Sequence, residues 1–179
     1  TTTFSTGMAT NPRSVALGDV NGDGRLDIIT ANRNSSTASV LLGTGGSAIT
    51  ATFTPQQTFA TGNAPKSVAL ADVNGDGRLD MITANIYANS TSVLLGNGNG
   101  NGTFGPNTDF STGSLSNPAS VTLGDVNGDG NLDIITANFT FPGKVSVLLG
   151  NGNGTFQGQQ TYATGAIPQS VTLGDVNGD

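Results

Sequence analysis

Three nine-residue stretches of the sequence carry oxygen-bearing side chains at alternating positions. In the first, DVNGDGRLD over residues 19–27, Asp or Asn stands at positions one, three, five and nine, and Gly24 stands at position six. Such an alternation, with the glycine at a sharp turn and the carbonyl of position seven as a further donor, is typical of loops that bind Ca²⁺. Without a cation, carboxylates crowded in this way would repel one another. We therefore predict a Ca²⁺ site in each stretch.

The predicted ligands recur at the same positions in every copy. We name residues 19–27, 72–80 and 125–133 loops 1, 2 and 3, and a fourth copy begins at residue 175 and reaches only its fifth position. The predicted Ca²⁺ ligands, including the seventh residue for its carbonyl, are Asp19, Asn21, Asp23, Arg25 and Asp27; Asp72, Asn74, Asp76, Arg78 and Asp80; Asp125, Asn127, Asp129, Asn131 and Asp133; and Asp175, Asn177 and Asp179.

Two other interpretations of these loops are possible. An EF-hand shares the first half of the pattern but needs a Glu at position twelve and flanking helices, whereas Thr30, Thr83 and Thr136 stand there and the flanks read as strands. A turn rich in Asp and Asn that binds no metal is the plainer alternative. Three intact copies of a four-side-chain pattern favour the Ca²⁺ site over that alternative.

The acidic residues are concentrated in these motifs. All twelve are Asp, eleven lie in the four copies, and only Asp109 lies outside them. The net charge of −6, with no basic stripe, argues against a nucleic-acid partner, and no apolar run approaches the ~18 residues of a membrane span. The sequence has no His, Cys, Glu or Trp, which leaves acid–base and thiol catalysis few candidates. We expect neither an enzyme nor a protein inserted in a membrane.

The motifs belong to a repeat that must position them. They begin at residues 19, 72, 125 and 175, spaced 53, 53 and 50 residues apart, and each repeat holds four short apolar runs. Four strands in a period of ~50 residues predict an all-β fold, a β-propeller built of four-stranded blades. The runs are continuous rather than alternating, which fits strands covered on both faces. Two stacked antiparallel sheets are the alternative, but they give no reason for a fixed period.

We expect a single, partial β-propeller domain over residues 1–179. Its repeats span approximately residues 8–60, 61–113 and 114–165, followed by an incomplete repeat over 166–179, and residues 1–7 would supply the outer strand of the closing blade. Because the chain stops inside its own most repeated motif, we expect a fragment. The remainder of its own chain, or another copy, would close the ring.

The chain resembles the FG-GAP/VCBS repeats of integrin-α-type β-propellers. The resemblance rests on DVNGDGRLD between two strands, the following ITAN, SVLLG and NGNGTF, and the period, and it covers essentially the whole chain. The name-giving Phe-Gly-Gly-Ala-Pro stretch is present only loosely, as FATGNAP over 59–65. The resemblance implies Ca²⁺ in the turn between the first two strands of each blade, an extracellular setting, and commonly seven blades.

The connections at the opposite ends of the strands differ between repeats. They cover residues 32–39, 85–92 and 138–146, whereas the loops hardly change. A constant scaffold with one variable face is typical of a recognition surface. Ordinary solvated loops are the alternative. The candidate ligand-binding residues on this face are Arg33, Tyr87, Phe139, Phe141 and Lys144.

These observations predict a Ca²⁺-stabilised recognition or adhesion propeller, secreted or on the cell surface, that binds a protein or glycan. Two alternatives remain open. One is a lectin-like propeller that binds glycans on the variable face. The other is the propeller part of a larger secreted enzyme that acts on polysaccharides.

Overall fold

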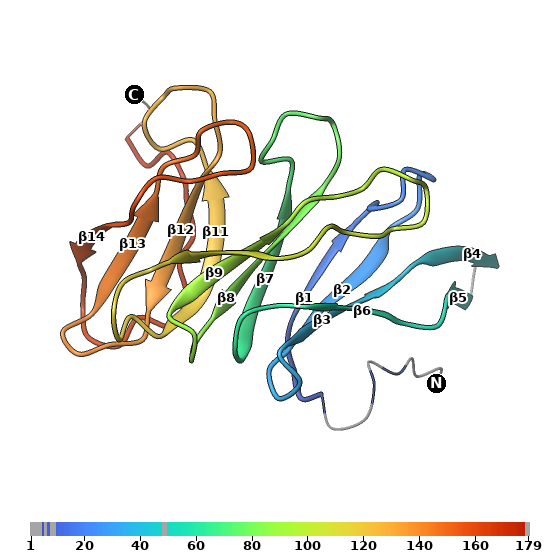
Figure 1. Ribbon diagram of the computed structural model, residues 1–179, viewed down its shortest axis with the longest axis horizontal. Coiled ribbons are helices and arrows are strands. Elements are labelled where there is room, and N and C mark those ends of the chain that lie inside the picture. Colours follow the sequence, from blue (N-terminus) through green and yellow to red (C-terminus); the bar gives the residue numbers. More distant parts are fainter. Residues whose placement is uncertain (1–4, 6, 8–9, 48–49, 178–179) are drawn as a thin grey trace.

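All regular secondary structure in the described chain is β-strand. The computed structural model describes residues 5, 7, 10–47 and 50–177, and no helix occurs among them (Figure 1). The sequence is rich in Gly, Thr, Val, Ser and Asn and lacks Glu, so it offers few good helix formers. The all-β prediction is confirmed.

Three four-stranded antiparallel sheets form the repeated units, which we call blades 1, 2 and 3. Blade 1 contains β1 (Pro12–Gly18), β2 (Asp27–Asn32), β3 (Thr37–Leu41) and β6 (Gln57–Ala60). Blade 2 contains β7 (Pro65–Ala71), β8 (Asp80–Asn85), β9 (Ser90–Leu94) and β10 (Thr108–Ser111). Blade 3 contains β11 (Pro118–Gly124), β12 (Asp133–Asn138), β13 (Lys144–Leu148) and β14 (Gln160–Ala163).

Each blade is an up-and-down meander with the same register. In blade 1, Gly18 pairs with Asp27, so loop 1 closes the hairpin of β1 and β2 at that end. Pro12 begins β1 at the other end, where a residue without an N–H costs no ladder bond. The blades stand side by side, with these hairpin loops on one face and the variable connections on the other (Figure 1).

The segment between the third and fourth strands differs in blade 1. There an extra hairpin forms from β4 (Gly43–Ser47) and β5 (Thr50–Phe53). Blades 2 and 3 instead make the tight Asn-Gly turns expected from the sequence, each closed by one bridge, Gly96 to Phe104 and Gly150 to Phe156. Glycines with positive φ occupy both turns, which is the conformation such turns require.

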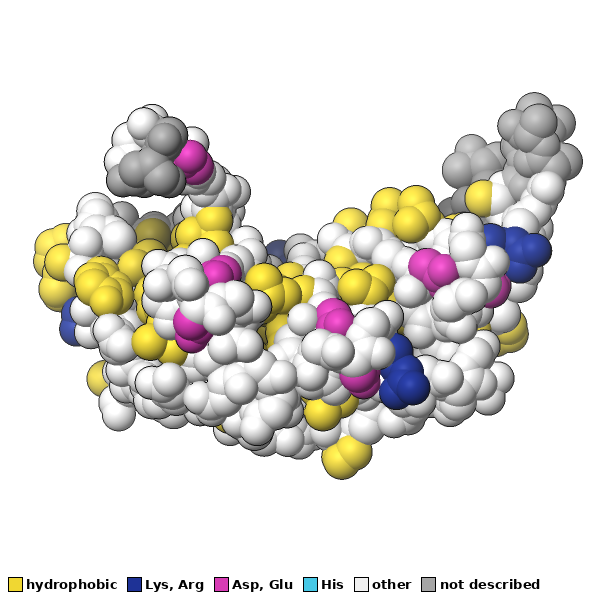
Figure 2. All heavy atoms as spheres, turned by 90° about the horizontal axis from the view of Figure 1, so that it is seen from above, with side chains coloured by type: hydrophobic (Ala, Val, Ile, Leu, Met, Phe, Trp, Pro, Cys, Tyr) yellow, Lys and Arg dark blue, Asp and Glu magenta, His cyan; other side chains and the backbone are white. Residues whose placement is uncertain are grey.

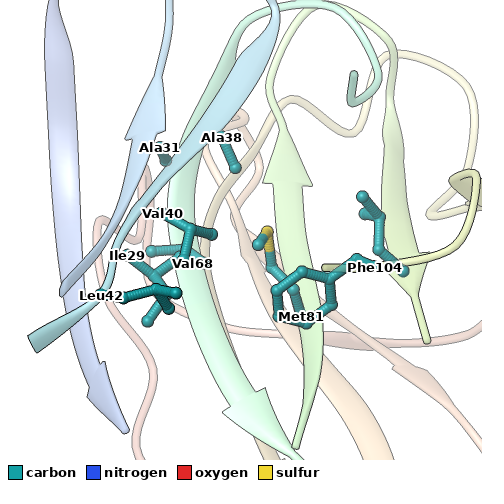
Figure 3. Close-up of a cluster of buried hydrophobic side chains, with 9 residues drawn as sticks. Ile29, Ala31, Ala38, Val40, Leu42, Val68, Met81 and Phe104 are labelled. Atoms are coloured by element: carbon teal, nitrogen blue, oxygen red, sulfur yellow. The ribbon is translucent and has the colours of Figure 1, made fainter. Parts of the chain in front are cut away.

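The core lies between the blades. Met81 belongs to the cluster between blades 1 and 2, and its neighbour Ile82 belongs to the cluster between blades 2 and 3. Successive residues of a strand point to opposite faces, so a middle strand covered on both sides reads as a continuous apolar run. In Figure 3, Ile29 and Val40 of blade 1 lie against Val68 of blade 2.

Small residues on the first strands allow this close approach. A Cβ on Gly18 would lie 2.8 Å from Cδ1 of both Leu70 and Leu79 in the next blade. On Gly124 it would lie 2.6 Å from Cδ1 of Leu173, which follows blade 3. At both Gly18 and Gly124, a leucine of the following repeat therefore packs against the glycine of the first strand.

Two segments for which the sequence predicts a strand contain none among their described residues. Most of the outer strand predicted over residues 1–7 falls outside the described residues, and Ser5 and Gly7 lie in no strand. Residues 164–177 form no strand either. Within the described ranges, no further strand lies beside this segment to accept its backbone hydrogen bonds, whereas the equivalent β1, β7 and β11 each have such a partner.

Candidate functional site

The three acidic loops lie on one face of the molecule. Each connects the first two strands of a blade, and Figure 2 shows their acidic side chains as separate clusters spaced along this face. The glycines at positions four and six have positive φ in every loop, for example 78° at Gly22 and 81° at Gly24. This backbone conformation, which glycine adopts without strain, folds each loop back on its first residue.

The first carboxylate of each loop accepts backbone N–H bonds. Asp19 Oδ1 accepts from Gly22 at 2.7 Å and from Asp23 at 3.1 Å, and Asp19 Oδ2 accepts from Gly24 at 2.7 Å. In loop 3, such bonds, led by that from Gly130, hold the pKa of Asp125 below its ordinary value. The loop is therefore built to keep a negative charge at position one.

The ninth residue of each loop is a fully buried carboxylate. Asp27 Oδ2 accepts the N–H of Val20 at 2.9 Å, and Oδ1 accepts the N–H of Gly43 at 2.8 Å. The equivalent bonds of Asp80 and Asp133 are within 0.1 Å of these lengths. Burial raises the pKa of Asp27 and Asp80. The aspartate at position nine thus links its loop by hydrogen bonds to the segment that follows the third strand.

The interactions of the Asp at position five differ between the loops, because the residue at position seven differs. Asp23 Oδ2 accepts from Asn21 Nδ2 at 3.1 Å and pairs with Arg25 Nη1 at 3.2 Å. The bond from Asn21, followed by the interactions with Arg25, lowers the pKa of Asp23. Loop 2 has the same ion pair between Arg78 and Asp76, at 3.4 Å, whereas loop 3 carries the uncharged Asn131 at position seven.

The donor chemistry of the loops fits a hard cation. Every polar side chain at positions one, three, five and nine offers oxygen, which is what Ca²⁺ prefers. A carboxylate has about four lone-pair sites, so the N–H bonds leave room for a cation. Within the described residues, no three acidic, His or Cys side chains are already gathered around one point. In the fourth copy, Asp175 Oδ1 accepts the N–H of Asn177 at 3.2 Å, and Asp179 lies outside the described residues.

On the opposite face, cations rest on aromatic rings of the neighbouring blade. The guanidinium of Arg33 lies 5.1 Å from the ring centre of Tyr87 and donates to its hydroxyl. Lys66 Nζ lies 5.1 Å from the ring centre of Phe139. Burial, followed by the charges of Arg33 and Arg13, lowers the pKa of Lys66. These contacts link the variable connections of successive blades.

The predicted ligand residues divide between two hollows of this face. Phe139, Phe141 and Lys144 line a groove of about 610 Å³, whereas Arg33 and Tyr87 line a smaller one of about 360 Å³. The larger groove is also lined by residues that are not among the candidates predicted from the sequence, including Leu115, Asn117 and Gln159. The linker before blade 3 is two residues longer than the one before blade 2, but it is as long as the one before blade 1, so its length alone does not mark the groove in the sequence.

Repeated four-stranded blades, each with the same acidic loop between its first two strands, define a propeller-like repeat protein. The chain belongs to the FG-GAP-like repeat family, whose model matches residues 19–83, 72–136 and 125–179. The first two matches each contain two loops and end within the second strand of the following blade, β8 or β12, and the third contains loop 3 and the incomplete fourth copy. The matches together cover most of the chain, and they confirm the resemblance stated from the sequence.

Other comparisons add little to this assignment. No curated protein matches the chain. A solved structure of the Tc holotoxin pore of Photorhabdus luminescens, carrying a TccC3-D651A mutation, is similar over 84% of this chain and 9% of that chain, at 16% identity and a TM-score of 0.40. This chain thus spans about a tenth of that toxin chain. No helix among the described residues is long and apolar enough to cross a membrane.

Proposed function

We propose that this chain is a Ca²⁺-stabilised, non-catalytic recognition module that acts outside the cell. The observation that carries the proposal is an asymmetry within the molecule. Loops 1, 2 and 3 differ only at position seven and share the hydrogen bonds of their first residue, whereas the connections on the opposite face differ in length and composition. A constant face suits a structural cation, and a variable face suits a ligand.

The constant face supports the Ca²⁺ part of the proposal. Each loop carries three carboxylates and an amide oxygen within nine residues. Arginine neutralises part of that charge in loops 1 and 2, and nothing within the described loop 3 does so. Ca²⁺ would offset the repulsion in all three loops, and modules of this kind outside cells bind it in the ~0.1–1 mM range.

The variable face supports the recognition part. Arg13, Arg33, Lys66 and Lys144 lie there, and in the described chain the salt bridges involve only Arg25 and Arg78 of the acidic face. Four cations without carboxylate partners, with exposed aromatic rings among them, form a surface suited to an anionic or mixed ligand. The acidic side chains stand chiefly in the loops, which leaves few groups for acid–base catalysis.

The experiment that tests the Ca²⁺ proposal is a pair of thermal melts. Because Ca²⁺ would bind the folded loops alone, excess Ca²⁺ should raise the melting temperature by several degrees relative to EDTA. Replacing Asp23, Asp76 or Asp129 by Ala should remove one site each and leave two that can be titrated by calorimetry. Asp109→Ala, outside the loops, is the matched control and should keep all three. Coincident melting curves with EDTA and Ca²⁺ would refute the proposal.

The recognition proposal is tested on a panel of glycans and matrix proteins. Tyr87→Ala, on the variable face, should weaken binding of a ligand found on the panel. Asn99→Ala, in the Asn-Gly turn of the opposite face, should not. Equal effects of the two variants would place the ligand elsewhere on the molecule.

A further inference from the structure

Blade 3 departs from the other two blades in a connection that lines the groove of about 610 Å³. The linker from the Thr-Gly pair to the next Pro is Thr112–Pro118 before blade 3, two residues longer than Thr61–Pro65 before blade 2 and as long as residues 6–12 before blade 1. The connection from the second to the third strand runs from Asn85 to Ser90 in blade 2, and from Asn138 to Lys144 in blade 3, one residue longer. The two longer segments face each other across the 610 Å³ groove.

A change in backbone hydrogen bonding opens this groove. In blades 1 and 2, two backbone hydrogen bonds join the linker before the blade to the connection between its second and third strands. In blade 2, for example, Ile86 N donates to Ala64 O at 3.1 Å and Tyr87 N donates to Asn63 O at 3.3 Å. In blade 3 the first bond remains, from Phe139 N to Asn117 O at 3.0 Å. The next N–H, that of Thr140, turns back to Asn138 O at 2.7 Å instead. The two walls therefore separate after a single bond.

Two side chains in the opened walls are exposed apolar groups that the fold does not use. Phe141 is 84% exposed, and within the described chain its ring has no aromatic or cationic partner. Leu115 is 77% exposed and has a φ of 55°, a left-handed conformation that a leucine rarely adopts. Residues held in such strained conformations cluster at active sites and ligand clamps.

The remaining lining offers one charge and several hydrogen-bonding groups. Lys144 is the one charged residue of the groove, it is exposed, and it makes no ion pair with any described carboxylate. The side chains of Ser114, Gln159 and Thr161 are also exposed, and no described residue hydrogen-bonds to them. A free ring face, an unpaired ammonium and a set of hydroxyl and amide groups thus surround one hollow.

We propose that this groove binds a saccharide that carries a carboxylate, of the uronic-acid type. Phe141 would pack against the apolar face of a sugar ring, Lys144 would pair with the carboxylate, and Ser114, Gln159 and Thr161 would bond to ring hydroxyls. The proposal names the ligand class of the variable face and so rests on the proposed function. A saccharide fits better than an acidic peptide because one cation serves one carboxylate, and the neutral polar groups outnumber it.

The test is calorimetric titration of the Ca²⁺-loaded protein with trigalacturonate and with the matching neutral trigalactose. The acidic trisaccharide should bind at least tenfold more tightly than the neutral one. Phe141→Ala and Lys144→Gln should each weaken trigalacturonate binding about tenfold, the size expected for losing an aromatic contact or a charge-assisted bond. Tyr162→Ala, which removes an exposed aromatic ring outside the groove, is the matched control and should bind like the unchanged protein.

The outcomes separate this proposal from the proposed function. Failure of the unchanged protein to bind trigalacturonate, or an equal loss in Tyr162→Ala, would overturn the groove assignment while the Ca²⁺ melts still stand. Tighter binding of a hexa-aspartate peptide would overturn the saccharide class. A uronate could instead bind through Ca²⁺ on the opposite face, and Asp23→Ala, Asp76→Ala and Asp129→Ala, each of which removes one Ca²⁺ site, test for this. Loss of trigalacturonate binding in any of the three would also overturn the assignment. Retained melting temperatures of Phe141→Ala and Lys144→Gln exclude misfolding as the cause of their losses.

Discussion

At the scale of single residues, the loops separate two tasks among their acidic side chains. Asp76 at position five is partly exposed and bonds only within loop 2 and to Arg78. Asp80 at position nine is fully buried and joins the N–H groups of Val73 and Gly96, which belong to two different segments. The first residue has little role in the fold without metal, whereas the second holds the blade together in any state.

This division predicts different costs for two aspartate substitutions in loop 2. In EDTA, Asp80→Ala should lower the free energy of unfolding by about 2 kcal/mol or more, because it leaves two buried N–H groups without an acceptor. Asp76→Ala should change the stability in EDTA by less than about 0.5 kcal/mol, the usual range for a surface substitution. Urea unfolding with and without Ca²⁺ measures both. Equal costs in EDTA would contradict the division.

The residue at position seven should set the relative affinity of the sites. In loop 1, Arg25 holds Asp23 by an ion pair, and in loop 3 Asn131 cannot do so. A cation in loop 1 must compete with that guanidinium, so Arg25→Asn should tighten Ca²⁺ binding there several-fold, and Asn131→Arg should weaken it in loop 3. Calorimetry on chains in which the other two loops carry the Asp→Ala substitution measures each site. If Arg25→Asn weakened Ca²⁺ binding in loop 1 and Asn131→Arg tightened it in loop 3, the arginine would instead support the site.

At the scale of elements, the blades depend on backbone approaches that only glycine permits. A Cβ on Gly96 would lie 2.6 Å from the carbonyl oxygen of Leu79 in loop 2, and Gly43 and Gly150 meet the same backbone atom of loops 1 and 3 at 2.5 and 2.2 Å. This glycine lets the segment after the third strand donate its N–H to the buried aspartate. The loop and the end of the third strand are therefore one packed unit.

Gly96→Ala should consequently destabilise blade 2. The added methyl group must move either the segment or loop 2, which costs about 1–3 kcal/mol for overpacking, and the movement should also weaken Ca²⁺ binding at loop 2. Gly158→Ala is the control, because a Cβ there meets nothing within 4 Å. Thermal melts and calcium titrations of the two variants test the argument, which fails if the two behave alike.

The loops and the buried strands could be predicted from the sequence, because the patterns that indicate them lie within a few consecutive residues. Alternate Asp and Asn with glycines at positions four and six located the loops, and the continuous run in DMITAN indicated a strand buried on both faces, which β8 is. The bond between Asp80 and Gly96 could not be read, because it joins residues that only the closed meander brings together. The groove at Phe141 could not be read either, because it depends on how two separate segments pair, and the equally long linker before blade 1 keeps both of its backbone bonds.

At the scale of the whole molecule, the blades differ in how much neighbours cover them. Blade 2 supplies side chains to both apolar clusters, such as Met81 to one and Ile82 to the other. Blade 1 belongs to one cluster only, and Val15 and Leu17 of its first strand are 63% and 60% exposed. The outer strand β14 of blade 3 is exposed along its whole length. In stacked repeats, stability is a sum of repeat terms and nearest-neighbour interfaces.

Hydrogen exchange should therefore be slowest in the middle blade rather than uniform. Opening β8 breaks two interfaces, whereas opening β2 breaks one, so the amides of Ile82 and Thr83 should show the highest protection in the chain. Ile29→Ala, which weakens the cluster between blades 1 and 2, should speed exchange in blade 1 and leave β12 nearly unchanged. Mass-spectrometric or NMR exchange in Ca²⁺ buffer measures this gradient. Equal protection of β2, β8 and β12, all lowered together by Ile29→Ala, would instead show that the blades unfold as one cooperative unit.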